Sequence, residues 1–304
     1  MSVLQANILL LITAAIWGFA FVAQRAGMAH LGPFSFNAIR FGLGSLSLLP
    51  LVLATRRQRE FHPSLGRLVR SGALAGVVLF AGASLQQVGL VCTTAGKAGF
   101  ITGLYVVLVP LLGLLWGERV YLPAWIGAIS AVAGLYLLSV SEQLSISPGD
   151  LWITLGALFW ALHVQLIARL TQSIDALPLA AMQFAVCSLL SFGAAWATET
   201  ITWEAVRAAM VPLLYGSFMS VGIAYTLQVV AQRHASPTPA AIIMSLESPF
   251  AAFGGWLLLG ETMEMRQIAG AVLMLAGMLI AQIPTDAVRS LFRYPGRQVE
   301  ESRR

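Results

Sequence analysis

Long apolar stretches separated by short polar turns run through most of the chain. Ten of these stretches can each cross the hydrocarbon core of a bilayer, which takes about 20 apolar residues. Within a stretch the apolar positions are continuous and do not alternate, so the pattern predicts helices and not the strands of a membrane barrel. The pattern therefore predicts an all-α polytopic membrane protein with ten transmembrane helices, at 4–27, 33–54, 71–92, 95–116, 121–141, 149–170, 177–197, 208–231, 238–259 and 266–283.

The chain repeats its own plan at an offset of 143 residues. The offset matches Gly117-Glu118 to Gly260-Glu261, and it also pairs Trp17 with Trp160, Phe41 with Phe184, Gly127 with Gly270 and Gly134 with Gly277. Each unit holds five spans, an odd number, so the second unit enters the membrane from the opposite side. We therefore expect two inverted five-helix repeats, 1–143 and 144–283, followed by a cytoplasmic tail at 284–304 that includes a short interfacial helix around 288–292.

Inverted repeats favour a particular class of membrane protein. They are a building plan of secondary transporters, whose substrate site lies near the middle of the bilayer between the two units. The glycines that the repeat pairs, Gly127 and Gly134 with Gly270 and Gly277, predict close helix contact, either inside the molecule or at a dimer interface.

Composition excludes a soluble protein and a nucleic-acid-binding one. Hydrophobic residues make up 58% and charged residues 10% of the 304 residues, whereas soluble domains carry about 25% charged residues. The net charge of +5 arises from basic residues beside the apolar spans, as topology signals do. With the N-terminus inside, 13 of the 18 basic residues lie on the cytoplasmic side. We expect a multi-pass protein of the plasma membrane, in bacteria the inner membrane, with both termini cytoplasmic.

Several short motifs occur together at fixed places. They are Ala15-Ile16-Trp17-Gly18-Phe19, Arg40-Phe41, Thr93-Thr94-Ala95-Gly96-Lys97-Ala98, the two Gly-Glu pairs, and Glu247-Ser248-Pro249. In this set the chain resembles the EamA-type transporters of the drug/metabolite transporter superfamily. The resemblance implies ten-helix carriers of two inverted repeats that mostly export amino acids or other small metabolites. One departure is that Pro110 lies four residues beyond the position that matches Pro249.

Ionisable residues inside the spans are costly and are therefore candidates for the site. Glu247 lies near the middle of its span beside Pro249, where it can carry a coupling proton or simply bond to a neighbouring helix. Arg40 can bind a carboxylate, clamp backbone carbonyls or reach the outer surface. Lys97, the only lysine, can bind substrate, pair with Glu247 or mark a helix end, and His163 can act in the site or bond across helices.

Aromatic and amide side chains at similar depth complete the candidate set. Individually such groups often bond neighbouring helices together, but as a set they predict a polar central cavity. Trp17 and Trp160 belong to it as equivalent positions of the two repeats. The others are Gln24, Gln86, Gln87, Gln165, Gln183, Gln228, Tyr105 and Tyr225.

The sequence predicts a secondary active transporter and not an enzyme. It has no phosphate-binding loop for ATP and no zinc-protease or nucleophile-elbow motif, and Cys92 and Cys187 lack metal-ligand spacing, so we expect no catalytic residue, metal or cofactor. The expected partners are a small amphoteric or hydrophobic metabolite, the lipid bilayer and, as a candidate coupling ion, the proton. Export by alternating access as a monomer or homodimer is the leading interpretation. An intramembrane enzyme and a passive channel or receptor are the alternatives.

Overall fold

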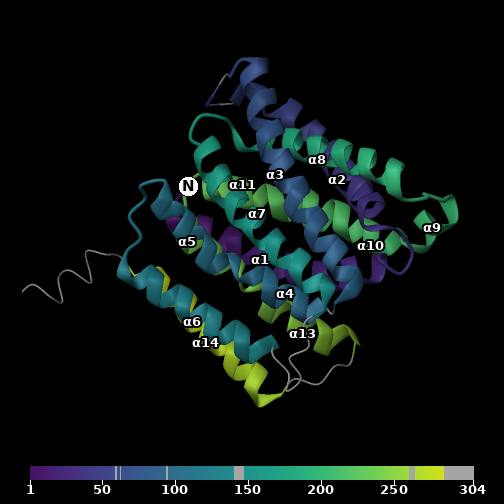
Figure 1. Ribbon diagram of the computed structural model, residues 1–304. Coiled ribbons are helices and arrows are strands. Elements are labelled where there is room, and N and C mark those ends of the chain that lie inside the picture. Colours follow the sequence, from purple (N-terminus) through teal and green to yellow (C-terminus); the bar gives the residue numbers. More distant parts are fainter. Residues whose placement is uncertain (59, 62, 94, 140–146, 260–263, 284–304) are drawn as a thin grey trace, which may run out of the picture.

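Helices account for the regular structure of this protein (Figure 1). The computed structural model describes residues 1–58, 60–61, 63–93, 95–139, 147–259 and 264–283, and in these ranges it contains no strand. The longer helices are α1 (Val3–Gly27), α2 (Pro33–Ala54), α3 (Leu65–Cys92), α6 (Leu122–Ser139), α7 (Pro148–Leu170), α8 (Ala176–Thr198) and α14 (Met265–Ala281). The shorter elements are η1 (Arg56–Gln58), α4 (Ala95–Gly103), α5 (Tyr105–Leu115), α9 (Trp203–Ala208), α10 (Met210–Leu214), η2 (Tyr215–Tyr225), α11 (Thr226–Gln232), α12 (Pro237–Met244) and α13 (Glu247–Leu259).

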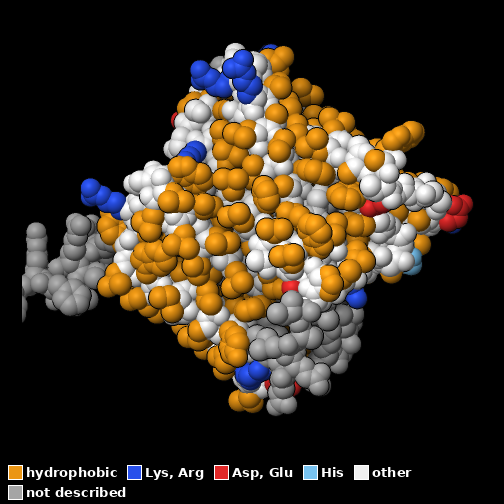
Figure 2. Space-filling model, viewed as in Figure 1, with side chains coloured by type: hydrophobic (Ala, Val, Ile, Leu, Met, Phe, Trp, Pro, Cys, Tyr) orange, Lys and Arg blue, Asp and Glu red, His pale blue; other side chains and the backbone are white. Residues whose placement is uncertain are grey.

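Helix occupies every predicted span. Seven helical stretches are long and apolar enough to cross a membrane, at 3–27, 33–54, 65–92, 98–115, 148–170, 176–198 and 210–232, and the apolar helices at 122–138 and 265–281 are shorter. Figure 2 shows apolar side chains over most of the face in view and basic side chains at the end where α2 meets α3. The prediction of an all-helical, multi-pass membrane protein is confirmed.

The third helix is longer than its apolar pattern. We expected a start at residue 71, but α3 begins at Leu65, because the Ser64 side chain caps it by accepting a hydrogen bond from the Arg67 backbone N–H at 3.3 Å. The first turns carry Arg67 and Arg70, both exposed. Hydropathy alone finds the apolar part of a helix and misses a polar extension of it.

Two predicted spans are interrupted at equivalent positions of the repeat. The span at 95–116 is split at Leu104 into α4 and α5, and the span at 238–259 is split at Ser245 and Leu246 into α12 and α13. At each break the backbone uses tighter bonds, from the Leu104 N–H to the Ile101 carbonyl at 3.2 Å and from the Leu246 N–H to Ile243 at 3.1 Å. Residue 104 plus the offset of 143 is residue 247, so α5 and α13 both start beside the same repeat position.

A π-helical segment, η2, forms the middle of the predicted span at 208–231. Three side-chain bonds tie it to α1. Trp17 Nε1 donates to the Ser220 carbonyl at 3.4 Å, Thr13 Oγ1 donates to Ala224 at 3.2 Å, and Tyr215 Oη donates to Ile16 at 2.9 Å. π-Helical turns are rare and often occur at functional sites. Here the wider turn sets which residues of this span point inward.

Bonds at both ends of the bundle fix α2 and α8, and α2 carries Arg40. At the α2 start, Glu199 accepts from the Phe34 and Ser35 backbone N–H groups at 2.9 and 2.8 Å. At the α8 start, Asp175 accepts from the Phe61 N–H at 3.2 Å and lies 3.8 Å from Arg233, which also pairs with Glu60. A carboxylate at a helix N-terminus is favourable because backbone N–H groups there lack intrahelical partners.

Glycines bring α6 and α14 into backbone contact, side by side at one edge of the bundle (Figure 1). A Cβ on Gly127 would lie 2.6 Å from the Gly277 carbonyl, and one on Gly134 would lie 2.5 Å from the Gly270 carbonyl. The predicted small-residue contact is therefore internal to the chain. The offset of 143 residues maps each of these two contacts onto the other, because Gly127 corresponds to Gly270 and Gly134 corresponds to Gly277.

Replacing Gly134 with leucine should separate α6 from α14 and destabilise the fold. The Met274 side chain, 2.5 Å from the added Cβ, can move away, but the Gly270 carbonyl at 2.5 Å is backbone and cannot, and overpacking of this kind costs about 1–3 kcal/mol. Thermal unfolding of the purified variant in detergent measures the loss. The matched control is Gly193→Leu, because Gly193 is exposed and nothing lies within 4 Å of a Cβ there. Equal melting temperatures for the two variants would contradict a tight glycine contact.

Three predicted features fall wholly or partly outside the described residues. They are the side chain of Lys97, the second Gly-Glu pair at Gly260-Glu261, and the tail at 284–304 with its interfacial helix.

Candidate functional site

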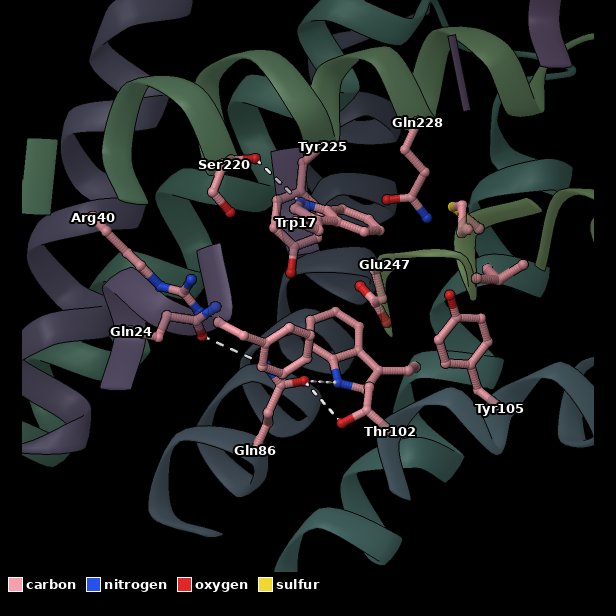
Figure 3. Close-up of a pocket in the computed structure, with 14 residues that line it drawn as sticks. Trp17, Gln24, Arg40, Gln86, Thr102, Tyr105, Ser220, Tyr225, Gln228 and Glu247 are labelled. Carbon is pink, nitrogen blue, oxygen red and sulfur yellow. Dashed lines mark hydrogen bonds between the residues drawn. The ribbon is translucent and has the colours of Figure 1, made fainter. Parts of the chain in front are cut away.

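One cavity collects side chains from both halves of the chain (Figure 3). It measures about 40 Å³, which is room for water molecules. Most of the predicted site residues line it, and so do several that were not predicted. The lining residues are Trp17, Phe21, Gln24, Arg40, Gln86, Thr102, Tyr105, Trp160, Val164, Ser220, Tyr225, Gln228, Met244 and Glu247.

Arg40 is a buried positive charge with no described acidic partner. Its side chain is 1% exposed, its Nε donates to Asn37 Oδ1 at 2.9 Å, and its guanidinium carbon lies 4.7 Å from the centre of the Phe41 ring. The guanidinium therefore neither clamps a backbone carbonyl nor reaches the outer surface in any described contact, which were two of its expected roles. Stacking and one hydrogen bond orient it, and the remaining N–H donors suit an anionic ligand group.

Glu247 is a buried carboxylate on the same cavity. It is 4% exposed and is the first residue of α13, directly after the break at Ser245 and Leu246. No described side chain donates a hydrogen bond to its carboxylate or forms an ion pair with it. The hydroxyls of the two nearby serines bond to backbone carbonyls and not to this carboxylate. Ser248 Oγ donates to the Gly99 carbonyl at 3.2 Å, and Ser245 Oγ donates to the Ile242 carbonyl at 2.9 Å. Glu247 is thus held in position, and no side chain in the described part of the chain occupies its oxygens.

A small hydrogen-bond network fixes Trp160 beside the cavity. Gln86 Oε1 accepts from Trp160 Nε1 at 2.9 Å and from Thr102 Oγ1 at 3.4 Å, and Gln86 Nε2 donates to Gln24 Oε1 at 3.5 Å (Figure 3). The indole lies against α3, because a Cβ on Gly82 would come within 3.2 Å of its ring. The donors of this network are therefore committed to the protein.

Aromatic rings pack together along the cavity wall. The ring centres of Trp17 and Tyr225 lie 4.5 Å apart, and those of Trp160 and Tyr225 lie 6.0 Å apart with the planes 27° from parallel. Trp17 and Trp160 come from α1 and α7, the first helices of the two predicted repeats. Their contact with Tyr225 closes one side of the cavity with an apolar surface.

Two predicted residues lie behind this wall and not on the cavity. His163 and Gln183 are both fully buried, with His163 Nε2 lying 2.9 Å from Gln183 Oε1. The His163 ring meets the Trp160 and Tyr225 rings edge-on at 6.2 and 6.5 Å. They support the wall from outside. Gln165 likewise bonds elsewhere, to the Val109 carbonyl at 3.0 Å and to Glu118 at 3.1 Å, and Gln87 is buried away from the lining.

Five lining residues were absent from the predicted set. Phe21 and Val164 lie one turn after Trp17 and Trp160 and are equivalent in the repeat, so the combination of helical and repeat spacing could have found them. Thr102, Ser220 and Met244 gave no signal, because their inward orientation follows from the breaks and the π segment.

The cavity offers opposite charges at separate places. In Figure 3 Arg40 lies at one end, and Tyr105 and Gln228 lie toward the other, with Glu247 nearer to them. No described ion pair joins Arg40 to Glu247, so among the described residues neither charge neutralises the other, and each can meet a ligand group of opposite sign. No cluster of metal-ligating side chains occurs among the described residues. The arrangement suits a small molecule that carries both a positive and a negative group.

Comparisons with known proteins relate this chain to a family of membrane transporters. A profile described as "EamA-like transporter family" matches residues 4–140 and again 147–282. A protein of Archaeoglobus fulgidus named as an uncharacterized transporter is 31% identical over 282 residues, covering 92% of this chain and 86% of that protein. A WAT1-related chloroplastic protein of Arabidopsis thaliana is 24% identical over 285 residues, covering 88% and 67%. A crystal structure similar at a TM-score of 0.72, with 19% identity over 91% of this chain and 96% of that one, supports the fold alone.

Proposed function

The chain belongs to the EamA-like transporter family, and from this premise we propose that it is a secondary carrier that exports a small amphoteric metabolite by alternating access. Its proposed location is the plasma membrane, which in a bacterial cell is the inner membrane. The carrier is not an enzyme, and its cargo leaves the cavity chemically unchanged. The substrate class that fits best is an amino acid or a compound with a similar pair of charges.

Ten spans in two inverted repeats are the architecture proposed for this carrier. The family profile matches the chain twice, in two ranges that nearly coincide with the proposed units 1–143 and 144–283. The equivalent breaks at Leu104 and beside Glu247, and the exchanged glycine contacts of α6 and α14, support the same twofold relation. Two inverted units around a shared cavity give a structure that can open to either side in turn.

A single observation carries the proposal. Arg40 and Glu247 are buried side chains that line one cavity, and no described ion pair joins them to each other or to another residue. A buried charge without a partner destabilises a fold, and substrate binding is the reason we propose for keeping both charges there. An amphoteric substrate supplies the missing partner for each charge while it is bound.

Transport in proteoliposomes tests the function. Thermal-shift screening of a metabolite panel identifies ligands, because a compound that binds only the folded state raises its apparent stability. The selected compound is then loaded inside the vesicles, and uptake of the labelled compound is measured. A carrier saturates and shows counterflow. Linear flux without counterflow would indicate a channel, and a chemically altered compound would indicate an enzyme, and either result would overturn the proposal.

Reporter fusions test the topology. Fusions at Gln58 and at the C-terminus should both report a cytoplasmic location, since most basic residues then lie inside. Signals from opposite sides at the two positions would contradict the ten-span inverted arrangement, and a periplasmic signal at both would contradict the expected orientation.

A further inference from the structure

We propose that one end of the cavity binds a free primary ammonium group through three oxygen acceptors, and that the carrier therefore selects primary amines over N-methylated ones. The acceptors are the Glu247 carboxylate, the Tyr105 hydroxyl and Gln228 Oε1. This inference rests on the proposed carrier function and specifies which chemical group the site distinguishes.

The orientation of the Gln228 amide follows from a chain of hydrogen bonds. Gln232 Nε2 donates to the Val164 carbonyl at 3.0 Å, which leaves Gln232 Oε1 as an acceptor. Gln228 Nε2 donates to that oxygen at 2.9 Å. Since a carbonyl can only accept, neither amide can be flipped. The group that Gln228 presents without a described partner is therefore its oxygen, on a side chain that is 1% exposed.

Tyr105 presents a second available oxygen. Its side chain is 4% exposed and lines the cavity, and its hydroxyl has no hydrogen-bond partner among the described residues. Tyr105 is the first residue of α5, just as Glu247 is the first residue of α13. Each of the two helix breaks thus places one oxygen-bearing side chain, Tyr105 or Glu247, on the wall of the same cavity. In Figure 3 the Tyr105 hydroxyl and the Glu247 carboxylate both point into the space below Gln228.

Three acceptors match the three N–H donors of a primary ammonium. Each methyl group added to the nitrogen removes a donor and leaves one buried acceptor unsatisfied, which costs about 1–3 kcal/mol. Among the described residues, the two indole donors that line the cavity are already used, because Trp160 Nε1 bonds to Gln86 and Trp17 Nε1 bonds to the Ser220 carbonyl. This end of the cavity therefore offers acceptors and negative charge.

An aromatic cage for a quaternary ammonium is the competing arrangement, and the ring geometry disfavours it. Such a cage presents open ring faces to the cation. Here Tyr225 packs against Trp17 at 4.5 Å and against Trp160 at 6.0 Å between ring centres, so these rings cover one another. The rings form an apolar wall, and the oxygens carry the recognition.

A counterflow assay in wild-type proteoliposomes, in which each probe competes with the labelled substrate, tests the preference for primary over N-methylated amines. The probes are the standard amino acids and, in parallel, their N-methyl and N,N,N-trimethyl derivatives. We expect the free amine to compete roughly 5- to 150-fold better than its monomethyl form, and the trimethyl form to compete least. Equal or better competition by the trimethyl series would overturn this inference and leave the carrier function standing. If no probe in either series takes part in counterflow, both the proposed substrate class and this inference are overturned.

Tyr105→Phe links the selection to a particular oxygen. The variant removes only the hydroxyl, so it should fold, and its preference for the free amine over the N-methyl compound should fall by roughly tenfold. The preference is a ratio, and a general loss of folded protein would leave it unchanged. The matched control is Tyr215→Phe, because the Tyr215 hydroxyl donates to the Ile16 carbonyl at 2.9 Å and Tyr215 does not line the cavity. A wild-type preference in Tyr105→Phe, or an equal loss in Tyr215→Phe, would contradict the assignment.

Discussion

Replacing Glu247 with glutamine is expected to abolish accumulation of substrate against its gradient, while exchange persists with a weakened affinity for substrate. Glutamine keeps the shape of the side chain and one acceptor oxygen, but it carries no charge and cannot bind and release a proton. An exporter driven by a proton gradient needs a group that holds a proton in one state and releases it in another. Glu247 is the carboxylate that lines the described cavity, at 4% exposure.

The size of the effect follows from the driving force. One proton that moves down a difference of one pH unit releases about 1.4 kcal/mol, which supports roughly tenfold accumulation. In proteoliposomes with an imposed pH difference, Glu247→Gln should therefore lose the whole of this accumulation and still show counterflow. Glu247→Asp should retain part of the coupling, with an altered pH dependence.

A control separates coupling from the mere loss of a carboxylate. Glu118 lies away from the lining and bonds to Gln165 and Arg169, at 3.1 and 3.4 Å. Glu118→Gln should therefore keep gradient-driven accumulation. If Glu247→Gln concentrates substrate as well as the wild type does, Glu247 only joins helices and the coupling lies elsewhere.

Replacing Arg40 with methionine should eliminate transport of amphoteric substrates without destabilising the protein. The guanidinium is 1% exposed and has no described acidic partner, so its burial costs free energy that a methionine of similar length does not incur. Losing the partner of a substrate carboxylate should reduce transport efficiency by roughly two orders of magnitude, since a buried charge pair contributes about 2–5 kcal/mol. Initial rates of counterflow and the melting temperature of the same preparation measure the two effects.

Arg25 provides the matched comparison for Arg40. It lies at the end of α1 and donates to the Leu90 carbonyl of α3, outside the cavity lining. Arg25→Met should therefore lower the melting temperature and leave the substrate preference unchanged. A large loss of stability in Arg40→Met, with transport retained by the folded fraction, would show that Arg40 is structural.

Residues that bear buried charges illustrate how much of the site could be predicted. Arg40 and Glu247 stand out in the sequence because ionisable side chains inside apolar spans are rare. The same criterion also selected His163, which the fold places behind the aromatic wall, bonded to Gln183. Depth along a span can be counted from sequence, whereas the direction in which a side chain points depends on the rotation of its helix.

The two helix breaks also separate what could be predicted from the sequence from what only the structure shows. The break beside Glu247 accompanies Pro249, whose ring nitrogen cannot donate the bond that a regular helix needs there. The equivalent break at Leu104 has no proline nearby, since Pro110 lies within α5. The repeat related the two positions, but only the structure places a break at both.

By itself the sequence determined the membrane class, the helical spans, the internal repeat and the rare buried charges, because hydropathy, periodicity and composition are properties of neighbouring residues. The tertiary structure alone decided which polar side chains meet. The π segment rotates Ser220 and Tyr225 inward, the break at Leu104 delivers Tyr105 to the cavity, and a chain of amides through Gln232 orients Gln228. These outcomes depend on how helices distant in the sequence pack against one another, and the rotation of a helix in a bundle is set by its partners and not by its own residues.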